Sequence, residues 1–186
     1  MVENAAEKTL SAVVAETTAR VPDAAALLSD ARCLTWAQLS EEAGRVAALF
    51  LKVGIGKGDV IGFAIDKKPE VVVGFLAAAR IGAIMAPINF KLHPDRIKDQ
   101  FRTSDITAML TQASRRSLMA ALKDVLPSPE RLIYVGDGAP EGCSDYAEHT
   151  DLDPVAEQAD ITPDTPCYYN YTSGTTGRPK GAITTH

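Results

Sequence analysis

The residues with the clearest chemical potential lie between positions 172 and 180. Four hydroxyl side chains, two glycines and a lysine occur there within nine residues: Thr172, Ser173, Gly174, Thr175, Thr176, Gly177 and Lys180. Glycines let backbone N–H groups point into a concave nest, hydroxyls donate further hydrogen bonds, and a lysine supplies a positive charge. This composition predicts a loop that binds a polyanion, and phosphate is its natural ligand.

The spacing differs from that of a Walker A loop. Pro179 stands before the lysine, and Gly181 occupies the place of the magnesium-binding Ser or Thr. The β-branched run 183–185 favours a strand after the loop, so a helix dipole would contribute little to phosphate binding. Hydroxyls, backbone amides and Lys180 are then the expected phosphate ligands. The alternative is an ordinary surface turn, since Gly, Ser, Thr and Pro are common turn residues.

Apolar segments alternate in type along the chain and predict the elements that carry this loop. Helices are expected at 10–20, 36–52, 70–81, 95–103 and 115–126, and strands at 60–65, 83–88, 107–111, 131–135, 166–171 and 182–185. Thr35 and Gln38 form a capping-box pattern at the start of the second helix, and 24–34 suits a small hairpin. Alternating strands and helices predict an α/β fold with a parallel sheet flanked by helices. Residues 136–166 are expected to be an exposed connection with one helical turn.

Composition excludes several classes of function. The 186 residues are 46% hydrophobic and 23% charged, as in ordinary globular proteins. A net charge of −5 leaves no basic field for a nucleic-acid partner. Three scattered cysteines and an amino terminus without a signal pattern predict a cytoplasmic protein. The apolar window 71–88 is interrupted by Arg80 and Pro87, so no transmembrane segment is expected, and the window is read as a buried helix and strand.

Weaker candidates are expected to be structural. The glycines at 54, 56 and 58 follow a helix and precede a strand, which is the reverse of the order in a dinucleotide fingerprint. The chain's histidines, His93, His149 and His186, lack metal-ligand spacing, and no metal ligand is assigned. Asp66 is expected in a turn, and Cys167 is expected to act as a small hydrophobic residue.

The segment 171–181, YTSGTTGRPKG, resembles the phosphate loop of the adenylate-forming enzymes, the superfamily of acyl-CoA synthetases, nonribosomal-peptide adenylation domains and firefly luciferase. Segments 34–39, 54–60 and 75–89 resemble, in order, the family's opening strand and helix, its turn into the first core strand, and its next helix–strand pair. The resemblance implies that residues 1–186 are the first part of the large N-terminal domain of an acyl-CoA synthetase-like ligase. The rest of the N-terminal subdomain and the C-terminal lid domain would be absent.

The resemblance also implies a reaction. Members bind ATP and a carboxylic acid, release pyrophosphate to form an acyl-adenylate, and pass the acyl group to a thiol. By resemblance, Thr172, Ser173, Gly174, Thr175, Thr176 and Gly177 would wrap the β- and γ-phosphates. Lys180 would be the catalytic residue that stabilises charge on the departing pyrophosphate. ATP, Mg²⁺ and CoA are the implied cofactors and co-substrates.

One segment separates branches of the family. Residues 87–92, PINFKL, resemble the pattern of acyl- and aryl-CoA synthetases, whereas amino-acid-activating domains usually carry an aspartate with a following Tyr-Pro. A carboxylic acid–CoA ligase is therefore favoured, with these residues alone inactive. The alternatives are an adenylation domain that loads a carrier protein and a short non-catalytic binding module that retains the fold. The sequence does not name the acid, and it is compatible with a homo-oligomer.

Overall fold

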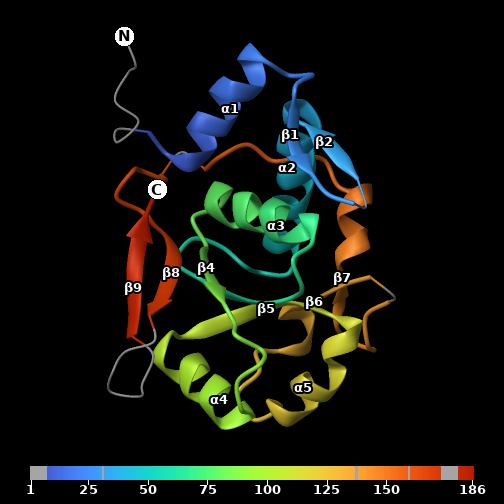
Figure 1. The fold of residues 1–186 in the computed structure, drawn as a ribbon, viewed down its shortest axis with the longest axis vertical. Coiled ribbons are helices and arrows are strands. Elements are labelled where there is room, and N and C mark those ends of the chain that lie inside the picture. Colours follow the sequence, from blue (N-terminus) through green and yellow to red (C-terminus); the bar gives the residue numbers. More distant parts are fainter. Residues whose placement is uncertain (1–7, 31, 137, 159, 173–179) are drawn as a thin grey trace.

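The computed structural model describes residues 8–30, 32–136, 138–158, 160–172 and 180–186. They form an α/β fold around a seven-stranded sheet with the order β7-β6-β5-β3-β4-β8-β9 (Figure 1). Its strands are β3 (Val60–Ala64), β4 (Ile84–Pro87), β5 (Ile106–Gln112), β6 (Leu132–Val135), β7 (Ser144–Asp145), β8 (Pro166–Thr172) and β9 (Lys180–Thr185). Every pairing is parallel except that of β8 with β9. The predicted parallel sheet is confirmed.

Helices cover both faces of the sheet, as the alternation of strands and helices predicted. The helices are α1 (Leu10–Arg20), α2 (Trp36–Lys52), α3 (Pro69–Arg80), α4 (Pro94–Thr103) and α5 (Arg116–Ala121). One apolar cluster packs α2 and α3 against Ile61 and Phe63 of β3, and the other packs α4 and α5 against Val60 and Ala64. Because side chains alternate along a strand, these two sets lie on opposite faces of the sheet. All five residues of β3 are buried, which accounts for its continuous apolar sequence.

The second helix, α2, begins where its sequence predicted. Thr35 Oγ1 accepts a hydrogen bond from Gln38 N at 3.3 Å, and Gln38 Oε1 accepts one from Thr35 N at 2.9 Å. This capping box opens α2. Just before it, β1 (Ala25–Leu28) and β2 (Cys33–Thr35) form the predicted antiparallel hairpin.

Two expectations about the later chain were wrong in part. The helix expected at 115–126 is shortened to α5, with a 3₁₀ turn before it and turns after it. Arg115 and Arg116 oppose the helix dipole at its start, and Pro127 disfavours a helical Leu126. The connection expected to be exposed contains β7 and a 3₁₀ helix, Tyr146–Asp151, whose Tyr146 is buried.

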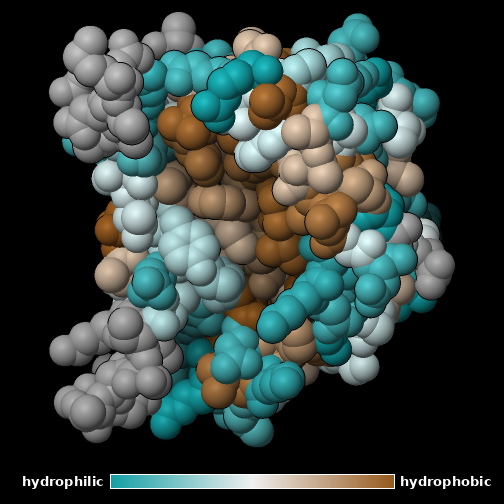
Figure 2. All heavy atoms as spheres, turned by 45° about the horizontal axis from the view of Figure 1, so that its top comes forward, coloured by the Kyte–Doolittle hydropathy of each residue, from teal (hydrophilic) through white to brown (hydrophobic). Residues whose placement is uncertain are grey.

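Apolar side chains also reach the surface. Figure 2 shows them gathered in a hollow on the face that includes α1 and α3, surrounded by polar side chains. Val13 of α1 and Val72 of α3 are 38% and 36% exposed. Among the described residues, none of the helices is long and apolar enough to cross a bilayer.

Candidate functional site

The strands β8 and β9 bring the two ends of the predicted phosphate loop together. Their antiparallel register pairs Thr172 with Lys180 and Tyr171 with Gly181. A strand rather than a helix follows the loop, as predicted. The remaining predicted ligands, Ser173, Gly174, Thr175, Thr176 and Gly177, lie outside the described residues.

The loop leaves the sheet at the carboxyl end of β8. Because β3 to β8 run parallel, the carboxyl ends of all of them meet at this edge. Ligands of open parallel sheets bind at that edge. The sheet therefore places Thr172 and Lys180 where the fold is suited to hold a ligand.

Two tyrosines of β8 face α4. The rings of Tyr169 and Tyr171 stack with their centroids 6.1 Å apart, and the Tyr171 hydroxyl donates a hydrogen bond to Ser104 Oγ. Burial raises the pKa of Tyr169, with smaller contributions from Tyr171 and Asp105. Tyr168 points to the opposite face of the sheet and packs edge-on against Phe75, with the two ring centroids 5.9 Å apart. Sequence reasoning assigned the strand but missed these contacts.

A second polar group follows β3 and β5 at the same edge. Gln112 Nε2 donates to Asp66 Oδ2 at 2.6 Å, and Asp66 N donates to Gln112 Oε1 at 3.0 Å. Arg115 pairs with Asp66 while its guanidinium lies 3.9 Å from the centre of the Phe90 ring. The hydrogen bond from Gln112 is the main reason why the pKa of Asp66 is lowered. Asp66, which was expected only in a turn, therefore joins the ends of β3 and β5. Its position directly after a buried strand was the sequence signal that could have indicated this role.

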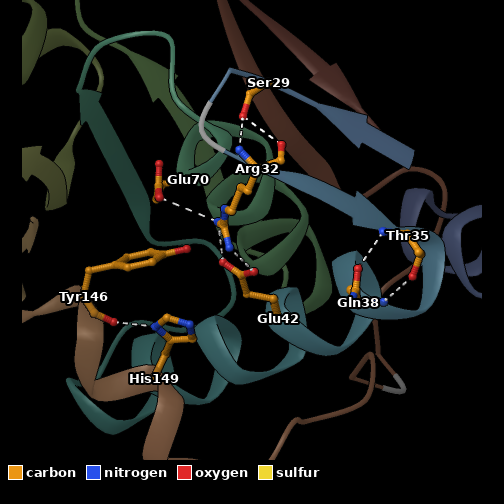
Figure 3. A network of polar contacts seen from close by, with 8 residues as sticks. All are labelled: Ser29, Arg32, Thr35, Gln38, Glu42, Glu70, Tyr146 and His149. Atoms are coloured by element: carbon orange, nitrogen blue, oxygen red, sulfur yellow. Dashed lines mark hydrogen bonds and ion pairs between the residues drawn. The ribbon is translucent and has the colours of Figure 1, made fainter. Parts of the chain in front are cut away.

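An ion-pair cluster lines a cavity of about 670 Å³ beyond the ends of β6 and β7 (Figure 3). Arg32 holds both oxygens of Glu42 at 2.7 and 2.8 Å, and Glu70 lies 3.6 Å away. The buried hydroxyl of Tyr146 points toward this cluster without a hydrogen-bond partner among the described residues. Burial, then Glu42 and Glu70, raises the pKa of Tyr146 well above its ordinary value. Because the charges pair with one another, the cluster joins the β1–β2 hairpin to α2 and α3.

The histidines occupy structural positions. His93 Nδ1 accepts from Asp95 N at 3.4 Å at the start of α4, and His149 Nδ1 lies 2.6 Å from Tyr146 O. His186 Nδ1 accepts from Leu10 N at 3.2 Å, a contact that fits the structural role expected for it. Within the described ranges, no group of three or more His, Cys, Asp or Glu residues is placed to hold a metal ion.

The cysteine and glycine candidates also behave as predicted. Cys167 is buried on β8, and burial raises the pKa of its thiol. Gly54 and Gly58 adopt positive φ angles of 78° and 85° in a turn before β3. This backbone conformation explains why glycine is present at both positions.

Comparison with known proteins identifies the family. A family model described as AMP-binding enzyme matches residues 14–186. Tyrocidine synthase 3 from Brevibacillus parabrevis is 33% identical over 185 residues, which cover 100% of this chain and 3% of that protein. A medium/long-chain-fatty-acid–CoA/3-oxocholest-4-en-26-oate–CoA ligase from Mycobacterium marinum is 31% identical over 175 residues, which cover 89% of this chain and 32% of that protein.

Solved structures agree on the fold. The crystal structure of an anthranilate CoA ligase in complex with anthranoyl-AMP superposes with a TM-score of 0.88 at 25% identity, covering 97% of this chain and 35% of that one. A putative long-chain-fatty-acid CoA ligase from Rhodopseudomonas palustris gives a TM-score of 0.84 at 24% identity, covering 96% of this chain and 44% of that one. The chain thus spans less than half the length of these relatives. It belongs to the family of AMP-binding enzymes, the adenylate-forming ligases and synthetases.

Proposed function

We propose that the protein of which these residues form the N-terminal part activates a carboxylic acid with ATP and transfers the acyl group to CoA. A carboxylate is a poor acyl donor until it carries a good leaving group, and AMP is that group. The observation that carries the proposal is the hairpin, which pairs Thr172 with Lys180 at the carboxyl edge of the sheet. The family match over residues 14–186 supports the same reaction class.

In this proposal, residues 172–177 bind the β- and γ-phosphates of ATP through hydroxyls and backbone amides. Lys180 stabilises negative charge as pyrophosphate departs, which makes it the catalytic residue of the segment. Mg²⁺ accompanies the nucleotide, and CoA is the acyl acceptor. A cytoplasmic location is part of the proposal and is supported by the three free cysteines.

CoA is favoured over a carrier protein by residues 87–92, which follow the pattern of acyl- and aryl-CoA synthetases. This segment leaves the carboxyl end of β4, where Asn89 Oδ1 accepts from Lys91 N at 3.2 Å. A carrier-loading adenylation domain is the second candidate, because tyrocidine synthase 3 is 33% identical over 185 residues. Thioester formation separates them, since CoA ligases release acyl-CoA and carrier-loading domains acylate a phosphopantetheinyl protein.

The test is acid-dependent ATP–pyrophosphate exchange by the full native protein, with a panel of aliphatic and aromatic acids. Lys180→Ala is expected to lower the exchange rate by roughly 10²-fold, because a charge that stabilises the transition state is lost. Lys123→Ala is the control, since Lys123 is an exposed lysine after α5. An unchanged rate in Lys180→Ala would reject the catalytic role of the lysine.

A further inference from the structure

The outer half of the β8–β9 hairpin has little support from the sheet. Within the described residues, a single register pair, Met85 with Tyr168, joins β8 to β4. The next four residues of β8 pair with β9, whose residues 181–185 are all exposed. A two-stranded hairpin on its own is marginally stable. Another contact must therefore fix the end of the hairpin that bears Thr172 and Lys180.

The structure provides that contact from α4, beside which the ends of β8 and β9 lie in Figure 1. The Tyr171 hydroxyl donates a hydrogen bond to Ser104 Oγ, which bridges 67 residues of sequence. Ser104 is 4% exposed and ends α4, where its N–H bonds to Gln100 O at 3.1 Å. Ile97 and Phe101 bury α4 in the core, so Ser104 is a fixed acceptor.

The residue opposite Tyr171 allows this arrangement. Gly181 pairs with Tyr171 across the hairpin, and a Cβ added to it would lie 3.3 Å from Tyr171 Cε1 and 3.5 Å from Tyr169 Cδ1. The two rings therefore lie close to the backbone of β9. Glycine leaves space for them on the face that points to Ser104.

We infer that the Tyr171–Ser104 hydrogen bond is a positioning contact for phosphate binding. The inference rests on the proposed function, since it assigns a task to the neighbour of Thr172. A groove for a polyanion binds more tightly when its donors are held in place before the ligand arrives, because less conformational freedom is lost on binding. Tyr171 is thus a positioning residue, because it acts by holding the end of the hairpin that bears Thr172 and Lys180.

The matched test compares Tyr171→Phe with Tyr169→Phe. Both changes remove one hydroxyl from the same face of β8, but the Tyr169 hydroxyl has no hydrogen bond to the described residues. The probe is inorganic tripolyphosphate with Mg²⁺, titrated into the full native protein and followed by ³¹P NMR. Loss of one hydrogen bond predicts a rise in Kd of about 3- to 10-fold for Tyr171→Phe. Tyr169→Phe is expected to stay within about twofold of the wild type.

A double-mutant cycle ties the effect to the bond. Ser104→Ala is expected to reproduce the change, and the double variant is expected to show no further weakening, because both substitutions remove the same interaction. In the full native protein, Tyr171→Phe should raise KM for ATP and leave KM for the acid unchanged. A variant that only loses folded protein would lower the rate without altering either KM.

The outcomes separate this inference from the proposed function. If the wild-type chain binds tripolyphosphate, Lys180→Ala does not, and Tyr171→Phe binds like the wild type, then the positioning role alone is overturned. If the wild type does not bind tripolyphosphate, the phosphate-loop assignment fails and the inference fails with it. Urea unfolding of each variant, measured in the same buffer, shows that binding is compared between folded proteins.

Discussion

The residue His186 connects the end of β9 to the start of α1. Its Nδ1 accepts a hydrogen bond from Leu10 N at 3.2 Å, and its Nε2 is buried without a partner among the described residues. Burial lowers the pKa of His186 below its usual value of 6.5, and Glu157 opposes this shift. The folded chain therefore takes up a proton on this ring less readily than the unfolded chain.

The sign of the pH dependence follows from that shift. The contribution of His186 to stability is fully present above pH 6.5 and is lost as the pH falls from 6.5 through the folded-state pKa. Urea unfolding at about pH 7.5 and 5.5 should show a larger loss of unfolding free energy in the wild type than in His186→Asn. The asparagine side chain keeps an acceptor but does not titrate. Equal losses of unfolding free energy in both proteins would contradict the lowered pKa of His186 in the folded chain.

The same residue shows what a sequence can predict about single side chains. The lack of metal-ligand spacing favoured a structural role for His186, and its hydrogen bond with Leu10 N is consistent with that role. Its partner, Leu10, lies 176 residues away, and no local pattern specifies such a contact. Likewise, the loop motif predicts Thr172 and Lys180 as phosphate ligands, whereas the bond from Tyr171 to Ser104 depends on the packing of α4.

Among the elements, α2 contains a glycine that helix propensity does not explain. Gly44 is buried in mid-helix, where an added Cβ would lie 2.7 Å from Arg80 Nη1 and 2.7 Å from Pro154 Cβ. Neither neighbour is free to move. Arg80 donates to Ser40 O at 3.2 Å and to Val155 O at 3.1 Å, and Val155 N donates to Gly44 O at 3.1 Å. Glycine therefore lets the segment after the 3₁₀ helix pack directly on α2.

Gly44→Ala is expected to destabilise the chain, although alanine favours a helix by about 1 kcal/mol over glycine. The overlap with fixed neighbours costs about 1–3 kcal/mol and should exceed that gain. Chemical denaturation measures the difference. Gly56→Ala is the control, because a Cβ at Gly56 would meet no atom within 4 Å, and we expect it to be neutral or to stabilise by about 0.5 kcal/mol. A Gly44→Ala protein as stable as the wild type would show that Pro154 can move away.

Element prediction succeeded where the local signals were complete. The capping box and apolar spacing gave α2 its observed bounds, and the continuous apolar run gave β3. The strand β7 escaped prediction because Ser144–Asp145 has no apolar pattern and exists through its pairing with β6. Tyr146 likewise packs in an apolar cluster with residues of α2 and α3, which are distant in sequence.

Considered as a whole, the sheet holds separate polar groups at its carboxyl and amino edges. The sequence predicted parallel strands but not their order, because β5 returns to the far side of β3 from β4 and no local signal encodes that crossing. The loop lies at the edge of the sheet where the carboxyl ends of the parallel strands meet. The amino edge holds a different polar group, in which Asp59, Thr107 and Arg131 connect the starts of β3, β5 and β6.

Asp59 is the centre of that group. Its Oδ1 accepts from Thr107 Oγ1 at 2.7 Å and from Arg131 Nη1 at 3.1 Å, and its Oδ2 accepts from Gly56 N at 2.9 Å. Burial alone would raise the pKa of Asp59, but the hydrogen bonds and the charge of Arg131 outweigh it and lower the pKa below 3.8. The ionised carboxylate therefore stabilises the fold above pH 3.8, and this contribution is lost as the pH falls through the lowered pKa.

Asp59→Ala is expected to lower the unfolding free energy by about 1–3 kcal/mol, because Arg131 and Thr107 lose their common acceptor. Asp30→Ala, at an exposed position in the β1–β2 turn, should change it by less than about 0.5 kcal/mol. Both variants should bind tripolyphosphate with the wild-type Kd at a temperature where they are folded, since the amino edge lies at the opposite ends of the strands from the loop. Weaker binding by folded Asp59→Ala would mean that the two edges are coupled through the sheet, and phosphate affinity would then depend on the stability of the whole fold.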